Sequence, residues 1–557
     1  MNPEAQARLE YFKTKPIDGL AFKKLLEAGL TWLKANQEIV NTLNVFPVPD
    51  GDTGTNMVLT MQSAYAEIRD SGQRHIGQLT QAISQGALMG ARGNSGVILS
   101  QIWRGFSRAL HDSEVLNGQN LVKALDEARI TAYKGVVRPV EGTILTVIKD
   151  VAKAASEAFK ETQDPYEILE RIIPAADASV EHTPELLPVL KQAGVVDSGG
   201  KGLFFILEGM LKYVYGEPLD SPEATVQPLS AMNLEETMNS VEPGQDYEVV
   251  VDFKPDSELD LKKFYTGLEE MGTSIQVGEG DGIYRMHIHV PTENRYLPID
   301  YILDMGTVTK VEMENLVAQM EDAGQSRGNE KIDLTAIEPG QIAVVAVSPG
   351  FGISRVFASL GVAALVEGGQ TMNPSTQELL NAFENLPTDQ VIILPNNKNI
   401  ILAAQAAREV TVKKLHIVPS RTIPQGLSAM MHLNIDGDVE KIAEKMNKAL
   451  EEVISGEITV ATRSVEIDGV AVEKDQVISL MNGKLVCSAN SIEEAVMVML
   501  EKAETGDFEL ITLFYGQDLP AQEANRITDI VRKEYPSLEI ELQDGGQPHY
   551  QFIISVE

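Results

Sequence analysis

The stretch Asn44-Val-Phe-Pro-Val-Pro-Asp-Gly-Asp-Thr-Gly-Thr-Asn-Met57 places two carboxylates, Asp50 and Asp52, on one short loop. Proline before the acids and glycine around them favour a tight turn that aims both side chains at one point. Two like charges held this close are costly unless a cation lies between them. Mg²⁺ suits such a loop, because it takes one or two protein carboxylates and completes its shell with phosphate and water. The alternative is an ordinary Asp-Gly turn between two helices.

A glycine-rich segment follows in a helical context. Apolar residues recur at helical spacing over 22–43, 56–68 and 76–110, and the last pattern is broken once, at Met89-Gly-Ala-Arg-Gly-Asn-Ser-Gly96. Glycines there let backbone amides approach an anion closely, and Arg92 adds a positive charge. The segment lacks the Gly-Lys-Ser/Thr of a Walker A loop and follows a helix rather than a strand. A glycine-rich break that serves helix packing is the alternative.

The N-terminal part of the chain is expected to be all-helical up to about residue 217. Two further glycine-bearing polar turns, at 138–143 and 196–200, separate its helices. An antiparallel helical array places alternate loops at one end, so the four special loops could form a single site. The further helices are expected over 121–136, 142–160, 165–180, 183–193 and 203–215.

The rest of the chain divides into smaller parts. Polar linkers are predicted at 218–245 and 324–336, on either side of a small α/β domain over 246–323. Strands and helices alternate over 337–557, which predicts a doubly wound α/β domain with its functional loops at the carboxyl ends of the strands. Strands in this last part are expected at 342–347, 391–394, 415–418, 458–467, 476–486, 510–515, 538–542 and 551–556.

The middle domain contains His287-Ile-His289, which puts two imidazoles on one face of a strand. Such a pair could hold Zn²⁺ with one more ligand. Structural or hydrogen-bonding roles are the alternative, since neither a cysteine nor a third histidine is nearby in the sequence.

Composition excludes several classes of function. The formal net charge of −35 argues against a nucleic-acid or anionic-membrane surface, because phosphate backbones are bound by clustered Lys and Arg. The single cysteine, Cys487, allows neither an internal disulfide nor a thiolate metal cluster, and a buried inert thiol is expected. The first residues do not resemble a signal peptide, and the chain has no apolar run long enough for membrane insertion, so we expect a cytoplasmic protein.

These motifs together resemble a known family. The acidic stretch at 44–57 and Gly90-Ala-Arg-Gly-Asn-Ser-Gly96 resemble the nucleotide-binding (DhaL-like, DAK2) domain of dihydroxyacetone kinases. The whole chain resembles the ATP-binding subunits of bacterial fatty acid kinases (the FakA family), through further motifs in its C-terminal half. These are Leu394-Pro-Asn-Asn-Lys-Asn-Ile400, Tyr515-Gly-Gln-Asp518 and Asp544-Gly-Gly-Gln-Pro548.

The resemblance implies a kinase with a division of labour. An N-terminal antiparallel helical barrel would bind ATP and Mg²⁺, and a separate DegV/FakB-type protein would present a bound fatty acid. The γ-phosphoryl group would pass to the fatty acid carboxylate, giving an acyl phosphate for phospholipid synthesis. The C-terminal domain resembles the DegV fold and is the expected docking site of that partner. We also expect a homodimer.

The resemblance also assigns roles to individual residues. Asp50 and Asp52 match the Mg²⁺-binding acids and are the expected catalytic pair, whereas the third acid of dihydroxyacetone kinases corresponds to Asn44 here. Polar or glycine positions that match the nucleotide-binding segments are Thr53, Asn56, Gly93, Asn94, Ser95, Gly96, Thr143, Asp197 and Gly199.

The middle domain departs from the family pattern, which has a cysteine joining two histidines on zinc. His287 and His289 are present, but Glu248 stands at the aligned cysteine position. Either Glu248 supplies an oxygen ligand to a weaker zinc site or the metal has been lost, and we favour loss.

Two other functions remain open from the sequence. One is a dihydroxyacetone-kinase-like phosphotransferase acting on a small hydroxyl substrate. The other is an ATP-binding adaptor that transfers no phosphate. A fatty carboxylate is already ionised at neutral pH and needs no general base, which favours it over a hydroxyl acceptor, because the helical domain shows no obvious catalytic histidine.

Overall fold

The computed structural model describes residues 12–43, 51–136, 138–219, 227–228, 246–257, 259–280, 283–315, 332–467, 469–504 and 508–557. These residues form two compact units. One comprises Met1–Asp220 and Ile332–Glu557, and the other comprises Ser221–Lys331. Most of both expected linkers, together with Asn44 and Asp50, lies outside the described residues.

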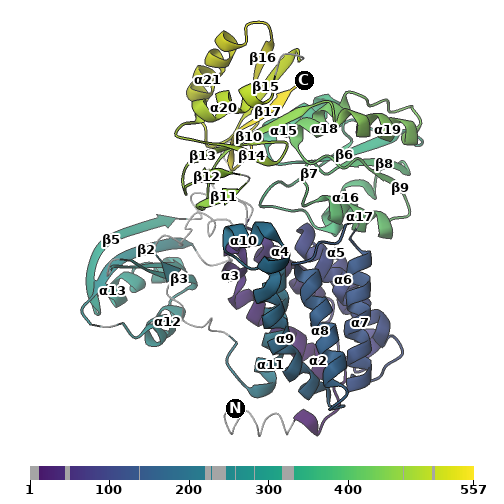
Figure 1. The fold of residues 1–557 in the computed structure, drawn as a ribbon, viewed down its shortest axis with the longest axis vertical. Coiled ribbons are helices and arrows are strands. Elements are labelled where there is room, and N and C mark those ends of the chain that lie inside the picture. Colours follow the sequence, from purple (N-terminus) through teal and green to yellow (C-terminus); the bar gives the residue numbers. More distant parts are fainter. Residues whose placement is uncertain are drawn as a thin grey trace. The chain divides into compact units, whose positions relative to one another are not determined.

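The N-terminal part of the first unit is helical, as expected (Figure 1). A closed ring of helices packs side by side in the order α2, α4, α5, α6, α7, α8, α9, α11 and back to α2. The ring encloses one apolar core, to which Leu33, Met57 and Val147 contribute fully buried side chains. The helices are α2 (Gly19–Ala35), α3 (Gln37–Thr42), α4 (Thr53–Ala66), α5 (Ile76–Met89), α6 (Gly93–Leu110), α7 (Gly118–Lys134), α8 (Ile144–Ala158), α9 (Pro165–Leu186), α10 (Pro188–Ala193) and α11 (Ser198–Tyr215).

Helix α9 is longer than the sequence pattern predicted. The expected break near residues 181–182 is absent, and the helix continues through Pro174 and Pro184. Proline has no N–H, so Pro184 cannot donate to the carbonyl of Val180. The hydroxyl of Thr183 donates to that carbonyl instead, at 2.6 Å, which removes the penalty of an unpaired buried acceptor.

The second unit is a small sheet with helices, in agreement with the expected α/β class. Its strand order is β1-β3-β4-β2-β5, antiparallel except for the short β1–β3 pair. Its core includes Phe253 and Phe264, whose rings lie 5.6 Å apart. The elements are β1 (Gln227–Pro228), β2 (Tyr247–Pro255), α12 (Leu261–Glu269), β3 (Thr273–Gly280), β4 (Ile283–Val290), α13 (Leu297–Leu303) and β5 (Gly306–Asn315).

The C-terminal part of the first unit begins with a parallel sheet of strand order β7-β6-β8-β9. All seven residues of β6 are buried, as expected for a parallel strand covered on both faces. The short strand β7 was not predicted. The elements are β6 (Ile342–Ser348), α15 (Phe351–Ser359), β7 (Ala364–Glu367), α16 (Thr376–Phe383), β8 (Gln390–Leu394), α17 (Ile401–Val410), β9 (Lys414–Ile417), α18 (Ile423–Met430) and α19 (Val439–Ala449).

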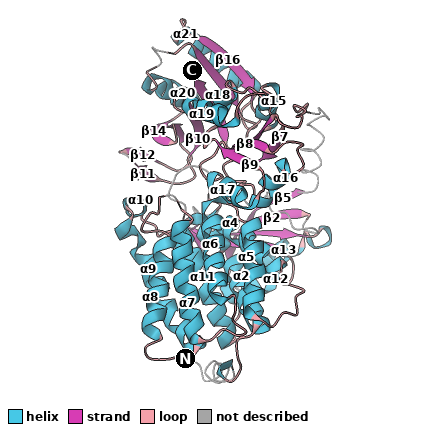
Figure 2. Cartoon of the chain, turned by 90° about the vertical axis from the view of Figure 1, so that its right-hand side faces the viewer, coloured by secondary structure: helices cyan, strands magenta, loops and turns pink. Residues whose placement is uncertain are grey.

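A second, mixed sheet completes this part, in the order β14-β13-β10-β17-β15-β16. Figure 2 labels three of its strands, β10, β14 and β16, in magenta. Only the β15–β16 pair in it is parallel. A separate hairpin pairs β11 with β12. The elements are β10 (Ile454–Val460), β11 (Val465–Ile467), β12 (Val470–Val472), β13 (Val477–Met481), β14 (Lys484–Ala489), α20 (Ile492–Lys502), β15 (Leu510–Tyr515), α21 (Ala521–Glu534), β16 (Glu539–Asp544) and β17 (Tyr550–Val556).

The predicted limits of two strands of this sheet were wrong. The predicted strand 458–467 is divided into β10 and β11, and the predicted strand 476–486 is a hairpin. Asn482 and Gly483 both have positive φ, of 52° and 76°, which is the two-residue turn that Asn-Gly favours between antiparallel strands. Within the described residues, no helix is long and apolar enough to cross a lipid bilayer.

Glycine packing in the helical ring gives a stability prediction. A Cβ at Gly105 would lie 2.6 Å from Cα of Ala128 and closer still to the carbonyl oxygen of Glu127. Gly105→Ala should therefore force α6 and α7 apart and lower the free energy of unfolding by about 1–3 kcal/mol. Both tryptophans of the chain, Trp32 and Trp103, lie in this ring, so urea unfolding followed by tryptophan fluorescence reports on it.

The matched control is Gly72→Ala, because a Cβ at Gly72 would meet no atom within 4 Å. It should leave the urea midpoint within error of the wild type. Equal midpoints for the two variants would contradict the close approach of α6 and α7.

Candidate active site

The first turns of four helices lie at one end of the helical ring. The hydroxyl of Ser198, which opens α11, lies 3.3 Å from the hydroxyl of Thr53, which opens α4. Asp197 accepts hydrogen bonds from the backbone N–H of Gly200 and of Ile144, and thereby joins α11 to the start of α8. A Cβ at Gly93, the first residue of α6, would lie 2.6 Å from Nδ2 of Asn56 on α4. The positive dipole ends of α4, α6, α8 and α11 thus meet.

Helix α6 differs from the other three in how it begins. Its N-cap residue, Arg92, has no side-chain cap bond, whereas the first turns of the other three helices are bonded by side chains. On α4, Oδ1 of Asn41 accepts the N–H of Gly54 at 2.8 Å and that of Thr55 at 3.2 Å. The amides at the start of α6 therefore keep their capacity to bind an anion, and the glycine-rich segment supplies them.

Asp52 is the N-cap residue of α4 and is half-buried. Its side chain bonds none of its own helix amides. It accepts a hydrogen bond from Nδ2 of Asn373, which belongs to the C-terminal part of the chain. A carboxylate has room for several partners, so this bond leaves Asp52 able to take a cation. Its expected companions Asp50 and Asn44 lie outside the described residues, and their roles stay predictions.

The last two glycines of the glycine-rich segment, Gly93 and Gly96, have structural reasons as well. Gly93 has φ of +56°, a conformation that side chains rarely adopt. A Cβ at Gly96 would collide with the hydroxyl of Thr60 on α4. Asn56 is 5% exposed and lies under Gly93. The glycines thus bring α6 close to α4, and this packing role is compatible with a phosphate-binding role.

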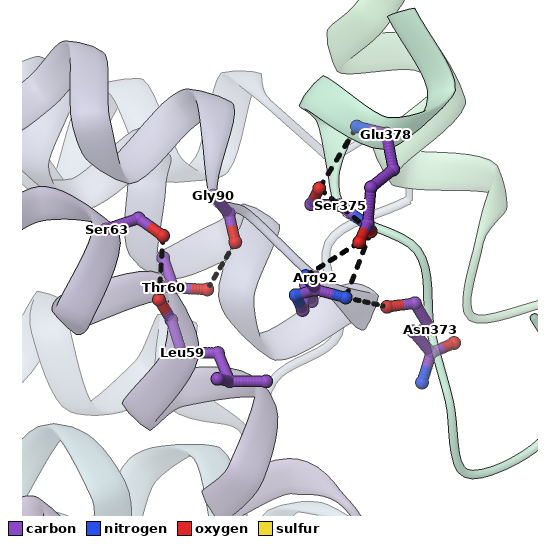
Figure 3. A network of polar contacts seen from close by, with 8 residues as sticks. All are labelled: Leu59, Thr60, Ser63, Gly90, Arg92, Asn373, Ser375 and Glu378. Atoms are coloured by element: carbon purple, nitrogen blue, oxygen red, sulfur yellow. Dashed lines mark hydrogen bonds and ion pairs between the residues drawn. The ribbon is translucent and has the colours of Figure 1, made fainter. Parts of the chain in front are cut away.

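Polar side chains of the glycine-rich segment reach the C-terminal part of the chain (Figure 3). Arg92 donates to the carbonyl of Asn373 at 3.1 Å and forms an ion pair with Glu378 at 3.0 Å. Asn94 donates from Nδ2 to Oδ1 of Asn399 at 3.3 Å. The charge of Arg92, expected to serve an anion, is therefore paired with a carboxylate. Ser95 lies one residue further on in the first turn of α6.

Thr143, Asp197 and Gly199 lie at the starts of α8 and α11. Thr143 caps α8 by accepting the N–H of Leu145 at 3.4 Å. Gly199 is buried against Ile144, to which a Cβ would make ordinary contact. Burial raises the pKa of Asp197 to about 6, although its two backbone hydrogen bonds act in the opposite direction. The observed bonds of Thr143 and Asp197 are caps, so these residues shape the site by holding two helix starts together.

Sequence reasoning missed Asn373 and Glu378. The loop 368–375 begins with Gly368-Gly369 but carries no acidic residue, and nothing in it pointed to Asp52. Asn399 could have been proposed as a site residue, because it belongs to the motif 394–400. That motif was quoted for a resemblance, without a contact to assign to it.

The second unit holds a separate group made of Glu248, His287 and His289. All three are buried, and one donor atom from each lies within 4.8 Å of the others. Glu248 pairs directly across strands β2 and β4 with His289. Nε2 of His287 lies 2.8 Å from Oε1 of Glu248, and neither ring nitrogen of His289 has a hydrogen-bond partner.

Burial foremost, and the neighbouring His287, lower the pKa of His289 to about 4. The imidazole is therefore neutral at physiological pH, which is the form that binds metals. A buried carboxylate beside a neutral, unbonded imidazole could hold a metal ion.

Comparisons with known protein families agree with this architecture. The DAK2 domain model matches residues 47–212. The middle-domain and C-terminal models of the FakA-like fatty acid kinase family match residues 242–323 and 343–557. The helical ring with its converging helix starts is thus the DAK2 domain of a multidomain protein.

Full-length relatives give the same result. An uncharacterized protein of Staphylococcus aureus is 37% identical over 548 residues, which cover 97% of this chain and 99% of that protein. An uncharacterized protein of Staphylococcus epidermidis is 37% identical over 550 residues with the same coverage. The chain belongs to the FakA-like family, which is named for fatty acid kinases.

Two solved structures show weaker likeness. The dihydroxyacetone kinase of C. freundii matches with 20% identity and a TM-score of 0.26, covering 34% of each chain. DegV, a fatty acid binding protein from Bacillus subtilis, matches with 15% identity and a TM-score of 0.30, covering 39% of this chain and 98% of DegV.

The raised pKa of Asp197 gives a pH prediction. Because the folded protein keeps the proton to about pH 6 and the ordinary value is 3.8, the folded state binds more protons than the unfolded state between these values. The contribution of Asp197 to stability should therefore fall as the pH rises from about 4 to about 6. The difference in unfolding free energy between the wild type and Asp197→Asn, measured by tryptophan fluorescence in urea, should move in favour of the variant over this range. Parallel pH profiles would contradict the raised pKa.

Proposed function

We propose that this chain is the ATP-dependent subunit of a fatty acid kinase. It transfers the γ-phosphoryl group of ATP to the carboxylate of a fatty acid that a DegV/FakB-type carrier protein presents. The observation that carries the proposal is the open start of α6, which faces the first turn of α4 next to Asp52. An anion site and a cation ligand side by side are what an Mg²⁺–polyphosphate needs.

Different residues of the chain would bind the phosphates and the metal during phosphoryl transfer. Amides at the start of α6 hold phosphate oxygens, and Asp52, with Asp50 as its proposed companion, holds the Mg²⁺ that neutralises developing charge. Thr53 and Ser198 lie hydroxyl to hydroxyl between α4 and α11 and offer further polar contacts. Such a transfer asks the protein for positioning and charge neutralisation more than for covalent steps.

The histidines of the helical domain favour a carboxylate acceptor. His111 ends α6 at its C-cap, and 18 helical residues place it about 27 Å from the open start of that helix. His75 caps the start of α5, and His182 is exposed and bonded to the carbonyl of Ala178. His75 and His111 therefore lie at the ends of α5 and α6 that are far from the glycine-rich segment, and a fatty carboxylate needs no general base.

The partner belongs to the proposal as well. A free fatty acid is poorly soluble, so the carrier brings it, and the C-terminal domain of this chain is the proposed docking site. We include the homodimer expected from the sequence in the proposal.

Reconstitution tests this function. ATP, Mg²⁺, oleate, a DegV-type carrier loaded with oleate and the wild-type chain should give acyl phosphate, trapped as the hydroxamate with hydroxylamine. Omitting the carrier should abolish product. Asp52→Asn should lower the rate at least 100-fold, because one charge on the cation ligand is lost.

Asp70→Asn is the matched control, since it removes the same charge from a side chain that is 90% exposed. It should keep the wild-type rate. ATP binding without acyl phosphate in the complete mixture would favour the adaptor, and product from dihydroxyacetone would favour the hydroxyl acceptor.

We further propose that the middle domain retains a metal site, with Zn²⁺ on Glu248, His287 and His289. The sequence favoured loss of the metal. The proposal rests instead on the three buried donor atoms within 4.8 Å and on the unbonded ring of His289.

Metal stripping and titration with Zn²⁺ against a chromophoric chelator test this site. The wild type should take one equivalent per chain. His289→Ala should take less than a tenth of an equivalent, and His432→Ala, which alters an exposed histidine, should match the wild type. Equal uptake by His289→Ala would exclude the site.

A further inference from the structure

The C-terminal part of the chain packs directly on the glycine-rich segment of the helical domain. Ala91 and Val97 belong to the same buried apolar cluster as Val345 and Val391 of the parallel sheet. The backbone N–H of Thr376, the first residue of α16, donates to the carbonyl of Ala91 at 3.1 Å. This is a packed interface with a shared core, which we call the seam.

Polar contacts surround the shared core of the seam. Arg92 pairs with Glu378 at 3.0 Å, and Arg104 on α6 pairs with Glu409 on α17 at 2.7 Å. Exposed ion pairs of this kind contribute little to stability. They therefore fix the orientation of the C-terminal part on α6 more than they strengthen the packing. The seam thereby holds the loop before α16 over the start of α6.

Asn373 lies in that loop and contacts the site from three directions. Its backbone carbonyl accepts from Arg92 at 3.1 Å (Figure 3). Its Nδ2 donates to the Asp52 carboxylate. A Cβ at Gly93 would lie 3.7 Å from the same Nδ2. The residue is 2% exposed, and among the described residues its remaining polar atom, Oδ1, has no hydrogen-bond partner.

The unpaired, buried Oδ1 of Asn373 and the bond from its Nδ2 to Asp52 together point to a ligand. A buried amide oxygen without a partner costs about 1–3 kcal/mol, so the site is satisfied only when a donor or a cation arrives. Amide and carboxylate oxygens are both ligands of hard cations and of the waters around them. The bond from Nδ2 also favours one rotamer of the half-buried Asp52 side chain.

We propose that Asn373 is a positioning residue which the C-terminal domain contributes to the nucleotide–metal site, orienting Asp52 and receiving a water of the bound cation on its amide oxygen. The inference rests on the proposed function, because it assumes that Asp52 binds the metal of a metal–nucleotide. It adds that the DAK2 domain is completed by another domain of the same chain.

Binding of Mn²⁺, used in place of Mg²⁺ and followed by electron paramagnetic resonance of the free ion, tests the role without needing turnover. The full chain is titrated in the presence of a non-hydrolysable ATP analogue. Asn373→Leu should weaken Mn²⁺ binding roughly tenfold, as expected for loss of a hydrogen bond to a charged group. Its melting temperature should stay close to that of the wild type, because leucine removes the unpaired Oδ1 together with the hydrogen bond to Asp52 at similar volume, and these two losses have opposite effects on stability.

Two further variants separate positioning from packing. Asn381→Ala changes an exposed asparagine on α16 that bonds only Gln377 in the same helix, and it should bind Mn²⁺ as the wild type does. In an Asp52→Asn background, Asn373→Leu should cause a smaller loss than in the wild type, because the part of its effect that acts through Asp52 is already gone.

Each outcome decides one point. Unchanged or tighter Mn²⁺ binding by Asn373→Leu, while the wild type binds metal and nucleotide, would overturn the role of Asn373 and leave the proposed function standing. Additive losses in the double variant would also overturn it. A wild-type chain that binds no metal–nucleotide would refute the proposed function and this inference together.

Discussion

The start of α6 is the constraint on which the rest of the site depends. A helix that begins without a side-chain cap leaves backbone amides unsatisfied, and these are tolerated where a ligand takes them. Three other helix starts, those of α4, α8 and α11, meet at the same end, and Asn41, Thr143 and Asp197 satisfy their amides. The ring therefore concentrates positive potential and directs it to one open position. A polyanion placed there needs a cation, which would explain the Asp52 carboxylate at the neighbouring start of α4.

The seam adds a second constraint. Three residues at or beside the candidate site of the helical domain each bond a residue of the C-terminal domain. They are Arg92, Asn94 and Asp52. Packing of the C-terminal domain orders these side chains, and nucleotide binding would use the same ordering. Nucleotide binding and packing of the C-terminal domain would therefore be thermodynamically coupled. If the C-terminal domain receives the acyl carrier, as proposed, these contacts would transmit that docking to the proposed nucleotide site.

The fold class could be read from the sequence because its periodicities are strong. Helical spacing over the first 217 residues and the buried strand at 342–347 were enough to predict three domains of the observed classes. Element limits failed where a local rule was overridden or overlooked: Thr183 replaces the hydrogen bond that Pro184 removes, and Asn482-Gly483 makes a turn inside one apolar run. The places of Asp52 and Gly93 at helix starts could be inferred from their motifs, and their roles stay predictions. The place of Asn373 could not be inferred, because its contact with Asp52 joins positions 321 residues apart that the tertiary structure alone brings together.

A crystal structure of the chain with Mn²⁺ and a non-hydrolysable ATP analogue tests the central claim most directly, because anomalous scattering locates the metal independently of the protein. The account predicts a metal bound by the Asp52 carboxylate at about 2 Å, with the phosphates against the first turn of α6. Nucleotide bound elsewhere, or phosphates that contact no amide of residues 93–96, would contradict the assignment of this end of the helical ring as the active site.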